Sequence, residues 1–278
     1  MRRTILRGLA AAVSLGAIVA SPGGSVRADG APVAVLVLKE HGVGSAAQAQ
    51  PYVDKLVAIT AKLNGWPGGK GEYHTRRDDA QRFIAASSPH FGILSLGAFL
   101  ALKEPNKLDV VGQAEVSRAG GKQYFIISKD AVDLGGCKGK TLASDHADDP
   151  RFIEKVVSGG AFKLSDFSLV PTKRPTQTIK KVVSGEAACA LIDDAQHADL
   201  GHIEGAGAVK AVWKSDKLPP MAIVAFGAAP PPERSAFQAS LGKVCAGEGA
   251  AVCGEVGLQS LRSAGPGDYA AVVAAYTK

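Results

Sequence analysis

Short apolar runs alternate with amphipathic stretches along most of this chain. The run at 34–38 is continuously apolar, a pattern typical of a strand buried on both faces. After it, apolar residues from Val53 to Leu63 recur at the spacing of one helix face, between Pro51 and Asn64-Gly65. Proline suits the first turn of a helix, and glycine suits the position after its end. The pattern therefore predicts a strand followed by a helix over 51–64.

The same alternation continues to the end of the chain. Further strands are predicted at 72–74, 91–96 and 108–116, with helices at 78–86 and 97–103. A second series follows the glycine-rich turn at 118–121, with strands at 124–128, 140–144, 168–171, 188–193 and 209–213 and helices at 150–157, 175–183 and 194–202. A strand at 221–226 and helices at 233–244 and 268–277 end the chain. Strands that alternate with helices indicate βαβ units.

The two series predict an α/β protein of two lobes, each a mainly parallel sheet flanked by helices. Lobe 1 is expected to take residues 29–117 and 218–278, and lobe 2 to take residues 118–217. The chain then crosses between the lobes twice, which makes a two-strand hinge. Strand ends and helix N-termini line the crevice between such lobes, so a small ligand is expected there.

Residues 1–28 have the pattern of an export signal. Arg2, Arg3 and Arg7 precede an apolar run at 8–20, and Val26-Arg27-Ala28 resembles a signal-peptidase site. The run is short and rich in glycine and alanine, so a cleaved signal is favoured over an uncleaved anchor. Arg2-Arg3 also resembles a twin-arginine signal, which leaves both export routes open. Either route predicts a periplasmic or otherwise extracytoplasmic protein.

Removing this segment changes the charge of the chain. Four of the 32 basic residues and none of the 26 acidic ones lie in it, so the formal net charge falls from +6 to +2. No block of like charges remains to follow a phosphate backbone, and the aromatic residues are scattered. The sequence therefore predicts no nucleic-acid partner.

All four cysteines lie in the exported part, where an oxidising compartment favours disulfides. Four cysteines allow three connectivities. The closeness of Cys245 to Cys253, and the position of Cys137 and Cys189 beside apolar strands, favour the pairs Cys245–Cys253 and Cys137–Cys189. No C-x-x-C and no adjacent histidine pair supports a zinc site at these residues.

Acidic residues crowd two turns where a predicted strand ends and a helix begins. The first is Asp145-His146-Ala147-Asp148-Asp149, ahead of Pro150. Asp149 is placed to cap the helix, whereas Asp145 and His146 lie at the strand end, where ligand residues gather. The second turn is Asp193-Asp194, in which we interpret Asp194 as the cap and Asp193 as a cleft residue.

Other candidates follow the first and third predicted strands. Lys39 and His41 lie in a glycine-containing turn, and Ser95 stands where a helix opens, as a hydroxyl donor or an ordinary cap. No G-x-S-x-G, H-E-x-x-H or phosphate-loop motif is present, so no enzyme activity is predicted. A metal or cation site remains an alternative, because Asp145, His146, Asp193 and His41 could converge from separate loops.

Five segments together resemble a known family. They are Pro51-Tyr52 with Asn64-Gly65-Trp66, Tyr73 with Arg76-Arg77-Asp78-Asp79, Phe91-Gly-Ile-Leu-Ser95, Cys137-Lys138-Gly139-Lys140, and Val183-Ser-Gly-Glu186 with Asp193-Asp194. In this order they resemble the phosphate/phosphite/phosphonate-binding group of ABC-transporter solute-binding proteins, which have the type II periplasmic binding fold. The resemblance implies capture of a small solute in the cleft and delivery to a membrane permease, by a monomer without a cofactor.

The chain departs from that group at the turn after Lys140. Members of the group offer hydroxyls and backbone N–H groups there, whereas this turn carries three aspartates. Carboxylates repel oxyanions, so we expect the turn to disfavour a bare phosphate dianion. A sensor or interaction module on the same fold is the other alternative. The candidate ligand-binding residues are Lys39, His41, Tyr73, Ser95, Ser144, Asp145, His146 and Asp193.

Overall fold

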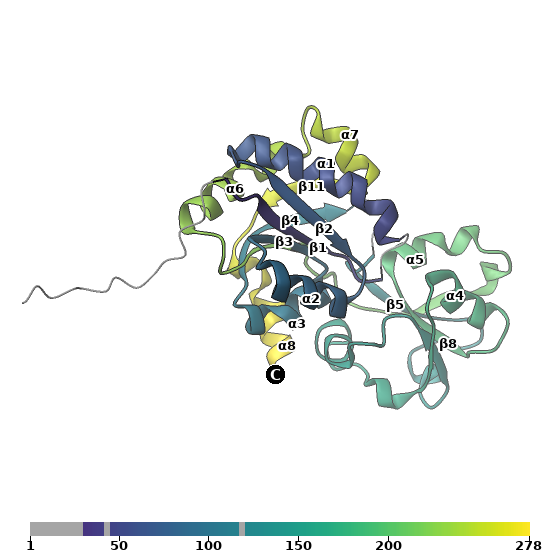
Figure 1. Ribbon diagram of the computed structural model, residues 1–278. Helices are drawn as coiled ribbons and strands as arrows, with labels where there is room; N and C mark the ends of the chain where they lie inside the picture. Colours follow the sequence, from purple (N-terminus) through teal and green to yellow (C-terminus); the bar gives the residue numbers. More distant parts are fainter. Residues whose placement is uncertain (1–29, 42–44, 117–119) are drawn as a thin grey trace, which may run out of the picture.

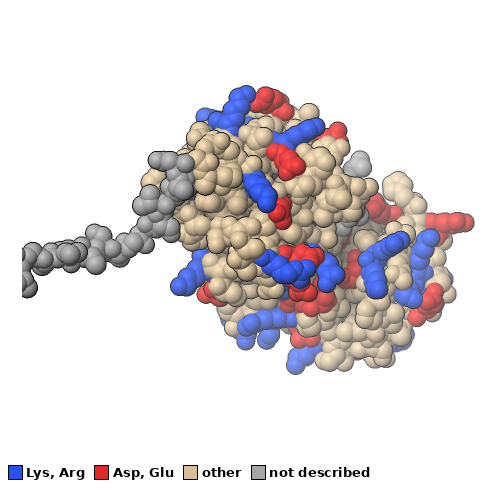
Figure 2. Space-filling view, in the orientation of Figure 1, with Lys and Arg blue, Asp and Glu red and all other residues tan. Residues whose placement is uncertain are grey.

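The computed structural model describes residues 30–41, 45–116 and 120–278, arranged as two lobes (Figure 1). The expected export signal at 1–28 lies outside these residues. Within them, no helix is both long and apolar enough to cross a membrane. On the face shown in Figure 2, basic and acidic side chains are interspersed, and neither sign covers a large area.

Each lobe is built on one sheet. The six-stranded sheet has the order β11 (Leu258–Ser263), β4 (Asp109–Val116), β10 (Met221–Ala225), β3 (Phe91–Leu94), β1 (Val33–Leu38) and β2 (Gly69–His74). The five-stranded sheet has the order β7 (Ser168–Pro171), β6 (Thr141–Ser144), β8 (Cys189–Asp193), β5 (Tyr124–Ser128) and β9 (Lys210–Lys214). The first lobe thus combines strands from both ends of the chain, and the second lobe uses the middle.

Both sheets mix parallel and antiparallel pairs. β1 is parallel to β2 and β3, whereas β10 is antiparallel to β3 and β4. In the second sheet β6 is parallel to β7 and β8, and β5 is antiparallel to β8 and β9. β10 runs against its neighbours because the chain enters it from the other lobe. The predicted two-lobed α/β fold is confirmed, but the expectation of mainly parallel sheets was wrong, because both sheets are mixed.

Helices cover both faces of the six-stranded sheet (Figure 1). One face packs against α1 (Ala46–Asn64), α6 (Pro231–Val244) and α7 (Gly249–Glu255), and the other against α2 (Arg77–Ser87), α3 (Leu96–Asn106) and α8 (Ala270–Thr277). Alternate residues of β1 supply the two cores, Val35 on the α1 side and Leu36 on the α3 side. This two-sided burial explains why the first strand is continuously apolar.

In the second lobe, α4 (Pro175–Val183) and α5 (Asp194–Ala198) lie against the sheet, and Phe152–Val157 forms a π-helix, η2. The sequence predicts a helix at 150–157 and does not reveal its wider winding. The α3-side core continues across the lobes, because Phe152 and Ile153 belong to the same apolar cluster as Phe99 and Val272. One side of the contact between the lobes is therefore apolar.

The two crossing segments are joined to each other. The Leu218 N–H donates to the Lys122 carbonyl at 2.8 Å, and the Ser215 N–H donates to the Tyr124 carbonyl at 2.8 Å. The Ser215 hydroxyl in turn accepts from the Tyr124 N–H at 3.0 Å. The crossings therefore form a hydrogen-bonded ribbon, the predicted two-strand hinge.

Two stretches differ from the sequence prediction. α1 begins at Ala46, ahead of Pro51, because Ser45 and Gln48 form a capping box in which each side chain accepts the other residue's N–H. Its predicted end is confirmed, with Gly65 in the left-handed region at φ 62°. α7 and β11 were not predicted. β11 is an edge strand that pairs with β4, and it has too few apolar residues to show a clear alternation in the sequence.

Both favoured disulfides are present. Cys137 is bonded to Cys189, with 6.0 Å between the Cα atoms, and Cys245 to Cys253, with 5.6 Å. The first ties the turn before β6 to the start of β8, and the second joins the end of α6 to α7. Each bond limits the conformations of the unfolded chain and so favours the fold.

Candidate functional site

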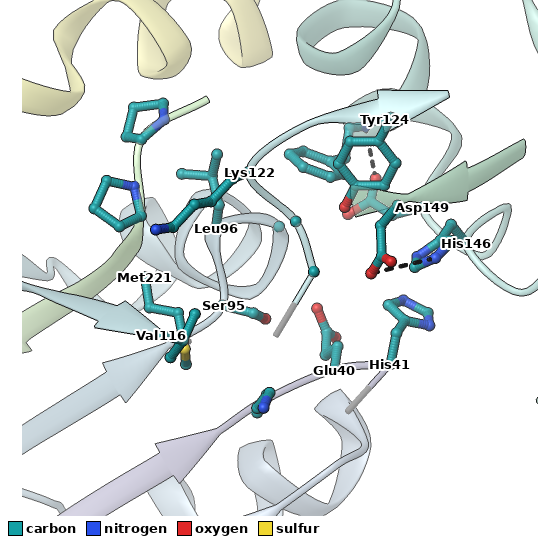
Figure 3. Close-up of a pocket in the computed structure, with 18 of the residues that line it drawn as sticks. Glu40, His41, Ser95, Leu96, Val116, Lys122, Tyr124, His146, Asp149 and Met221 are labelled. Carbon is teal, nitrogen blue, oxygen red and sulfur yellow. Dashed lines mark hydrogen bonds and ion pairs between the residues drawn. The ribbon is translucent and has the colours of Figure 1, made fainter. Parts of the chain in front are cut away.

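The carboxyl ends of strands from both sheets meet around a small cavity between the lobes (Figure 3). It measures about 50 Å³. The first lobe contributes the residues after β1, the start of α2 and the start of α3. The second lobe contributes the turns after β6 and β8, and the crossing ribbon forms one wall. The charged and polar side chains that line it are Lys39, Glu40, His41, Arg77, Ser95, Lys122, Tyr124, His146, Asp148, Asp149 and Asp193.

Asp149, in the turn after β6, reaches across to the first lobe. Asp149 Oδ2 accepts from Arg77 at 2.9 Å, while its Oδ1 accepts the Phe152 N–H at 3.0 Å and so starts the helix. Arg77 also forms a two-bond pair with Glu40, at 2.8 and 2.9 Å. Burial opposes the charge on Arg77, but the bonds to Glu40 and Asp149 outweigh it and raise its pKa. Glu40–Arg77–Asp149 is therefore a charged link between the lobes.

A second, weaker link lies beside the first. His41 Nε2 is 3.3 Å from Asp148 Oδ1. Burial lowers the pKa of His41, but the hydrogen bond and the charge of Asp148 outweigh it, and the net effect is a raised pKa. The Asp148 pKa is lowered, since the bond to His41 outweighs the cost of burying the carboxylate. Because Asp148 is 66% exposed, water screens this pair.

His146 is held with one ring nitrogen free. The residue is 4% exposed, and its Nε2 lies 2.7 Å from Gln196 Oε1. A carbonyl oxygen only accepts, so Nε2 carries a hydrogen. Nδ1 is buried without a partner among the described residues. Ser144, which is buried, accepts the His146 N–H at 3.0 Å, so it positions the histidine rather than lining the cavity.

Asp145 lies behind the cavity. Its Oδ1 accepts from the Thr178 hydroxyl at 2.8 Å and from the Gln196 amide at 3.0 Å. Gln196 therefore connects Asp145 with His146, and the Asp145 side chain is not part of the cavity wall. Of the three aspartates in this turn, only Asp148 and Asp149 line the cavity.

Asp193, and not Asp194, caps the helix that follows β8. Asp193 caps α5, because its Oδ1 accepts the Gln196 N–H at 2.9 Å, and it also lines the cavity. Burial raises the pKa of Asp193, and the nearby His146 opposes this. Asp194 accepts N–H groups of the crossing ribbon, from Gly121 at 2.9 Å and Lys122 at 3.0 Å, with Gln123 at 3.3 Å. The interpretation of Asp194 as the cap was wrong, because its side chain turns toward the ribbon.

Two groups of the first lobe face the cavity without partners. Ser95 precedes α3 and makes no capping bond, and its buried hydroxyl has no partner among the described residues. In Figure 3 this hydroxyl points toward the middle of the cavity. Lys39 is half-buried, and no described residue gives its ammonium group a hydrogen bond or ion pair. Burial lowers the Lys39 pKa, and the charge of Asp193 opposes this.

The structure thus brings together five of the eight predicted residues: Lys39, His41, Ser95, His146 and Asp193. Tyr73 lines a separate cavity in the first lobe. Glu40, Arg77 and Tyr124 are lining residues that the sequence analysis did not select. Arg77 stood in a quoted segment, but nothing in the sequence pairs it with Glu40 or Asp149.

Metal binding was an alternative for the converging acidic and histidine residues. Within residues 30–41, 45–116 and 120–278, no group of three or more such side chains is placed to hold a metal ion. The carboxylates near the cavity instead have partners in Arg77, His41, helix N–H groups and Thr178.

No protein-family model and no curated protein matches this chain. Among solved structures, a binding-protein component of an ABC phosphonate transporter from Pseudomonas aeruginosa is 14% identical over 87% of this chain and 84% of its own, with a TM-score of 0.62. A Xanthomonas citri protein bound to ATP is 11% identical over 89% and 98%, with a TM-score of 0.71. A Prochlorococcus marinus protein in complex with methylphosphonate is 10% identical over 86% and 95%, with a TM-score of 0.61.

The chain has the fold of the two-lobed periplasmic binding proteins. The resemblance seen in the sequence is thus confirmed for the fold. The matched regions include both sheets, since each comparison covers more than four fifths of this chain.

Proposed function

We propose that this chain is an extracytoplasmic solute-binding protein of an ABC transporter, which captures a small solute between its lobes and delivers it to a membrane permease. It works as a monomer and performs no catalysis. Residues 29–117 with 218–278 form one lobe and residues 118–217 the other. The observation that carries this proposal is the cavity between the lobes, in which Ser95 Oγ and His146 Nδ1 are buried without partners in the described part of the chain.

The pairing of the charged groups around the cavity favours a ligand with an anionic head. Asp148 and Asp149 already bind His41 and Arg77, and the Asp145 carboxylate is directed at Thr178 and Gln196. Among the described residues, the Lys39 ammonium and the Ser95 hydroxyl face the cavity without a partner, beside the N-terminus of α3, and all three suit an oxyanion. This arrangement weakens the repulsion that the three aspartates suggest in the sequence.

The solved structures of the same fold support the same ligand class. They are a component of a phosphonate transporter, a complex with methylphosphonate and a complex with ATP, and phosphonates and ATP all have phosphorus-bound oxygens. We therefore extend the proposal to a phosphonate or related oxyanion, held by Lys39 and Ser95. His146 Nδ1, which is buried without a partner among the described residues, supplies a further hydrogen-bonding position for the head group.

Calorimetry on the exported chain tests this proposal, with phosphate, methylphosphonate and an aminophosphonate as ligands. We expect saturable binding of at least one of them, and a loss of about tenfold in affinity for Ser95→Ala, the loss of one charge-assisted hydrogen bond. Ser87→Ala, on the exposed surface of α2, is the matched control. No binding of any of the three, with unchanged small-angle scattering on their addition, would contradict the proposal.

One observation favours the alternative of a sensor or interaction module without solute exchange. The apolar cluster around Phe99 and Val272 continues into Phe152 and Ile153 of the other lobe, so opening the cleft on that side exposes apolar surface. A module of this kind would keep its lobes together with or without solute. Scattering curves that fit one conformation under both conditions would support it.

A further inference from the structure

The first lobe contains a second, much larger cavity. It lies between α1 and the six-stranded sheet, beside the start of β11, and measures about 600 Å³. Its apolar lining residues include Val37, Val53, Leu56, Ile93, Val256 and Leu258. Tyr52 and Tyr73 also line it. The cavity is open to solvent on one side, and a mainly apolar hollow of this size is typical of a small-molecule site.

The two cavities adjoin each other. Lys39, Val116 and Met221 line both of them. Lys39 is the charged residue at the junction, and Val116 and Met221 begin the apolar lining beyond it. A molecule that extends through this junction would have its charged group beside Lys39, Ser95 and His146, and the rest of its length against apolar side chains.

The volumes of the two cavities also suit different parts of such a ligand. One water needs roughly 10–15 Å³ of such space, so the cavity of about 50 Å³ holds only a few water-sized groups, such as the oxygens of a single head group. Sites for whole small molecules typically measure about 300–1,000 Å³. Only the cavity of about 600 Å³ falls in that range.

We propose that the solute is an amphipathic anion, with its oxyanion head in the interlobe cavity and an alkyl or aryl body in the cavity under α1. This rests on the proposed solute-binding function and names the part of the solute that the polar site does not recognise. Lys39 binds the head and, at the junction, fixes which end of the molecule enters the apolar space. Tyr73, predicted as a ligand residue, then contacts the body of the solute.

A homologous series of ligands separates the contribution of the head group to affinity from that of the tail. Methylphosphonate, butylphosphonate and octylphosphonate are titrated into the exported chain by calorimetry. We expect affinity to rise by about fourfold for each added methylene that becomes buried, because each buried CH₂ adds a similar increment of transfer free energy. Octyltrimethylammonium, which has the same tail and a cationic head, is expected not to bind.

A filled cavity provides the structural control. Ala49 of α1 lines the larger cavity, whereas Ala47, two positions away, is exposed and is not a lining residue. We expect Ala49→Phe to remove the gain with tail length and to leave methylphosphonate affinity unchanged. Ala47→Phe is expected to retain the wild-type series. Thermal melting of both variants shows whether each is folded before its titration is read.

The outcomes distinguish this inference from the function on which it rests. Methylphosphonate binding with no gain for longer tails, or a gain that Ala49→Phe leaves intact, overturns the apolar site and leaves solute binding standing. Equal binding of octyltrimethylammonium overturns the assignment of an anionic head. Failure of every phosphonate to bind overturns both proposals.

Discussion

The turns after β6 and β8 look alike in sequence and have different partners in the structure. Each follows a buried strand and begins a helix, and each contains a pair of aspartates at that point. In the first turn Asp149 caps the helix and binds Arg77 of the other lobe. In the second, Asp193 caps the helix and Asp194 binds the backbone of the crossing ribbon. One turn holds the two lobes together, and the other holds the hinge.

In either turn, capping the helix uses only one carboxylate oxygen of the aspartate pair. This cap contributes about 1 kcal/mol to stability. The remaining oxygens are available for long-range partners, and these decide what each turn does for the molecule. Substitutions that remove one long-range partner at a time should therefore affect the two turns differently.

The largest effect is expected at Arg77, the partner of the first turn. Arg77→Gln leaves two largely buried carboxylates, Glu40 and Asp149, without their cation, at 9% and 12% exposure. We expect a loss of about 3 kcal/mol in the free energy of unfolding, measured by urea denaturation. Arg76→Gln, at 72% exposure, should change it by less than about 0.5 kcal/mol. Equal losses for the two variants would show that the link between the lobes is not formed in solution.

Asp194, in the second turn, is expected to give the next largest effect. Asp194→Ala removes the acceptor for the N–H groups of Gly121 and Lys122, so we expect a loss of about 2 kcal/mol in chemical denaturation. Amide exchange at these two residues should become faster in the same variant. Asp199→Ala, on the exposed surface after α5, provides the control. Unchanged exchange at both amides would contradict the assigned role.

A smaller effect is expected where the ribbon approaches the second turn. A Cβ atom at Gly120 would overlap the Asp193 carboxylate, so Gly120→Ala forces the carboxylate to move and disturbs its cap on α5. We expect thermal melting to report a loss of about 1–2 kcal/mol. Gly207→Ala places its new methyl group in open space and should be close to neutral. A Gly120→Ala protein as stable as wild type would mean that Asp193 is free to rearrange.

The smallest effect is expected at His41–Asp148 and depends on pH. The His41 pKa is raised above its ordinary value of 6.5, so its contribution to stability is complete below that pH and is lost as pH rises through the folded-state pKa. The Asp148 pKa is lowered below 3.8, so its contribution is lost as pH falls through that lower pKa. The stability difference between wild type and His41→Asn should therefore peak near pH 5, at under about 1 kcal/mol.

Denaturation curves across this pH range test the prediction. Asparagine accepts the left-handed conformation that His41 has at φ 58°, so the substitution adds little backbone strain. His202→Asn, at an exposed position in the second lobe, is the control for general histidine effects. A difference that grows above pH 7 would have the wrong sign for this pair.

Local sequence patterns predicted the parts of the molecule that depend on neighbours along the chain. The end of α1 at Gly65 was predicted from its sequence, and the disulfide between Cys245 and Cys253 joins residues close in sequence. The start of α1 was also readable, since Ser45 and Gln48 have the spacing of a capping box. The interpretation instead gave weight to Pro51, which the first turns of a helix tolerate.

Among contacts between distant residues, the Cys137–Cys189 disulfide was favoured from the sequence, but the charged and polar contacts were not readable in this way. Glu40 and Arg77 are 37 positions apart, and Gly121 and Asp194 are 73 apart. An aspartate at a strand end has several possible partners, and only the folded chain decides which is within reach. The strand positions therefore located the cavity, while the pairing of its charges, and hence which groups stay free for a solute, required the structure.

The hydrogen-bonded ribbon between the lobes limits the direction in which they move. A ribbon of two joined segments bends readily out of its plane and resists shear within it, so relative motion is reduced to rotation about one axis. Asp194, in the second lobe, holds Gly121 and Lys122, which lie opposite Leu218 in the ribbon. Pro219 and Pro220 follow Leu218 at the end nearest the first lobe and have no N–H to donate, so the axis is expected to pass close to them. Opening of the cleft should accordingly rotate the second lobe as a rigid body about this axis, at the edge of the first lobe.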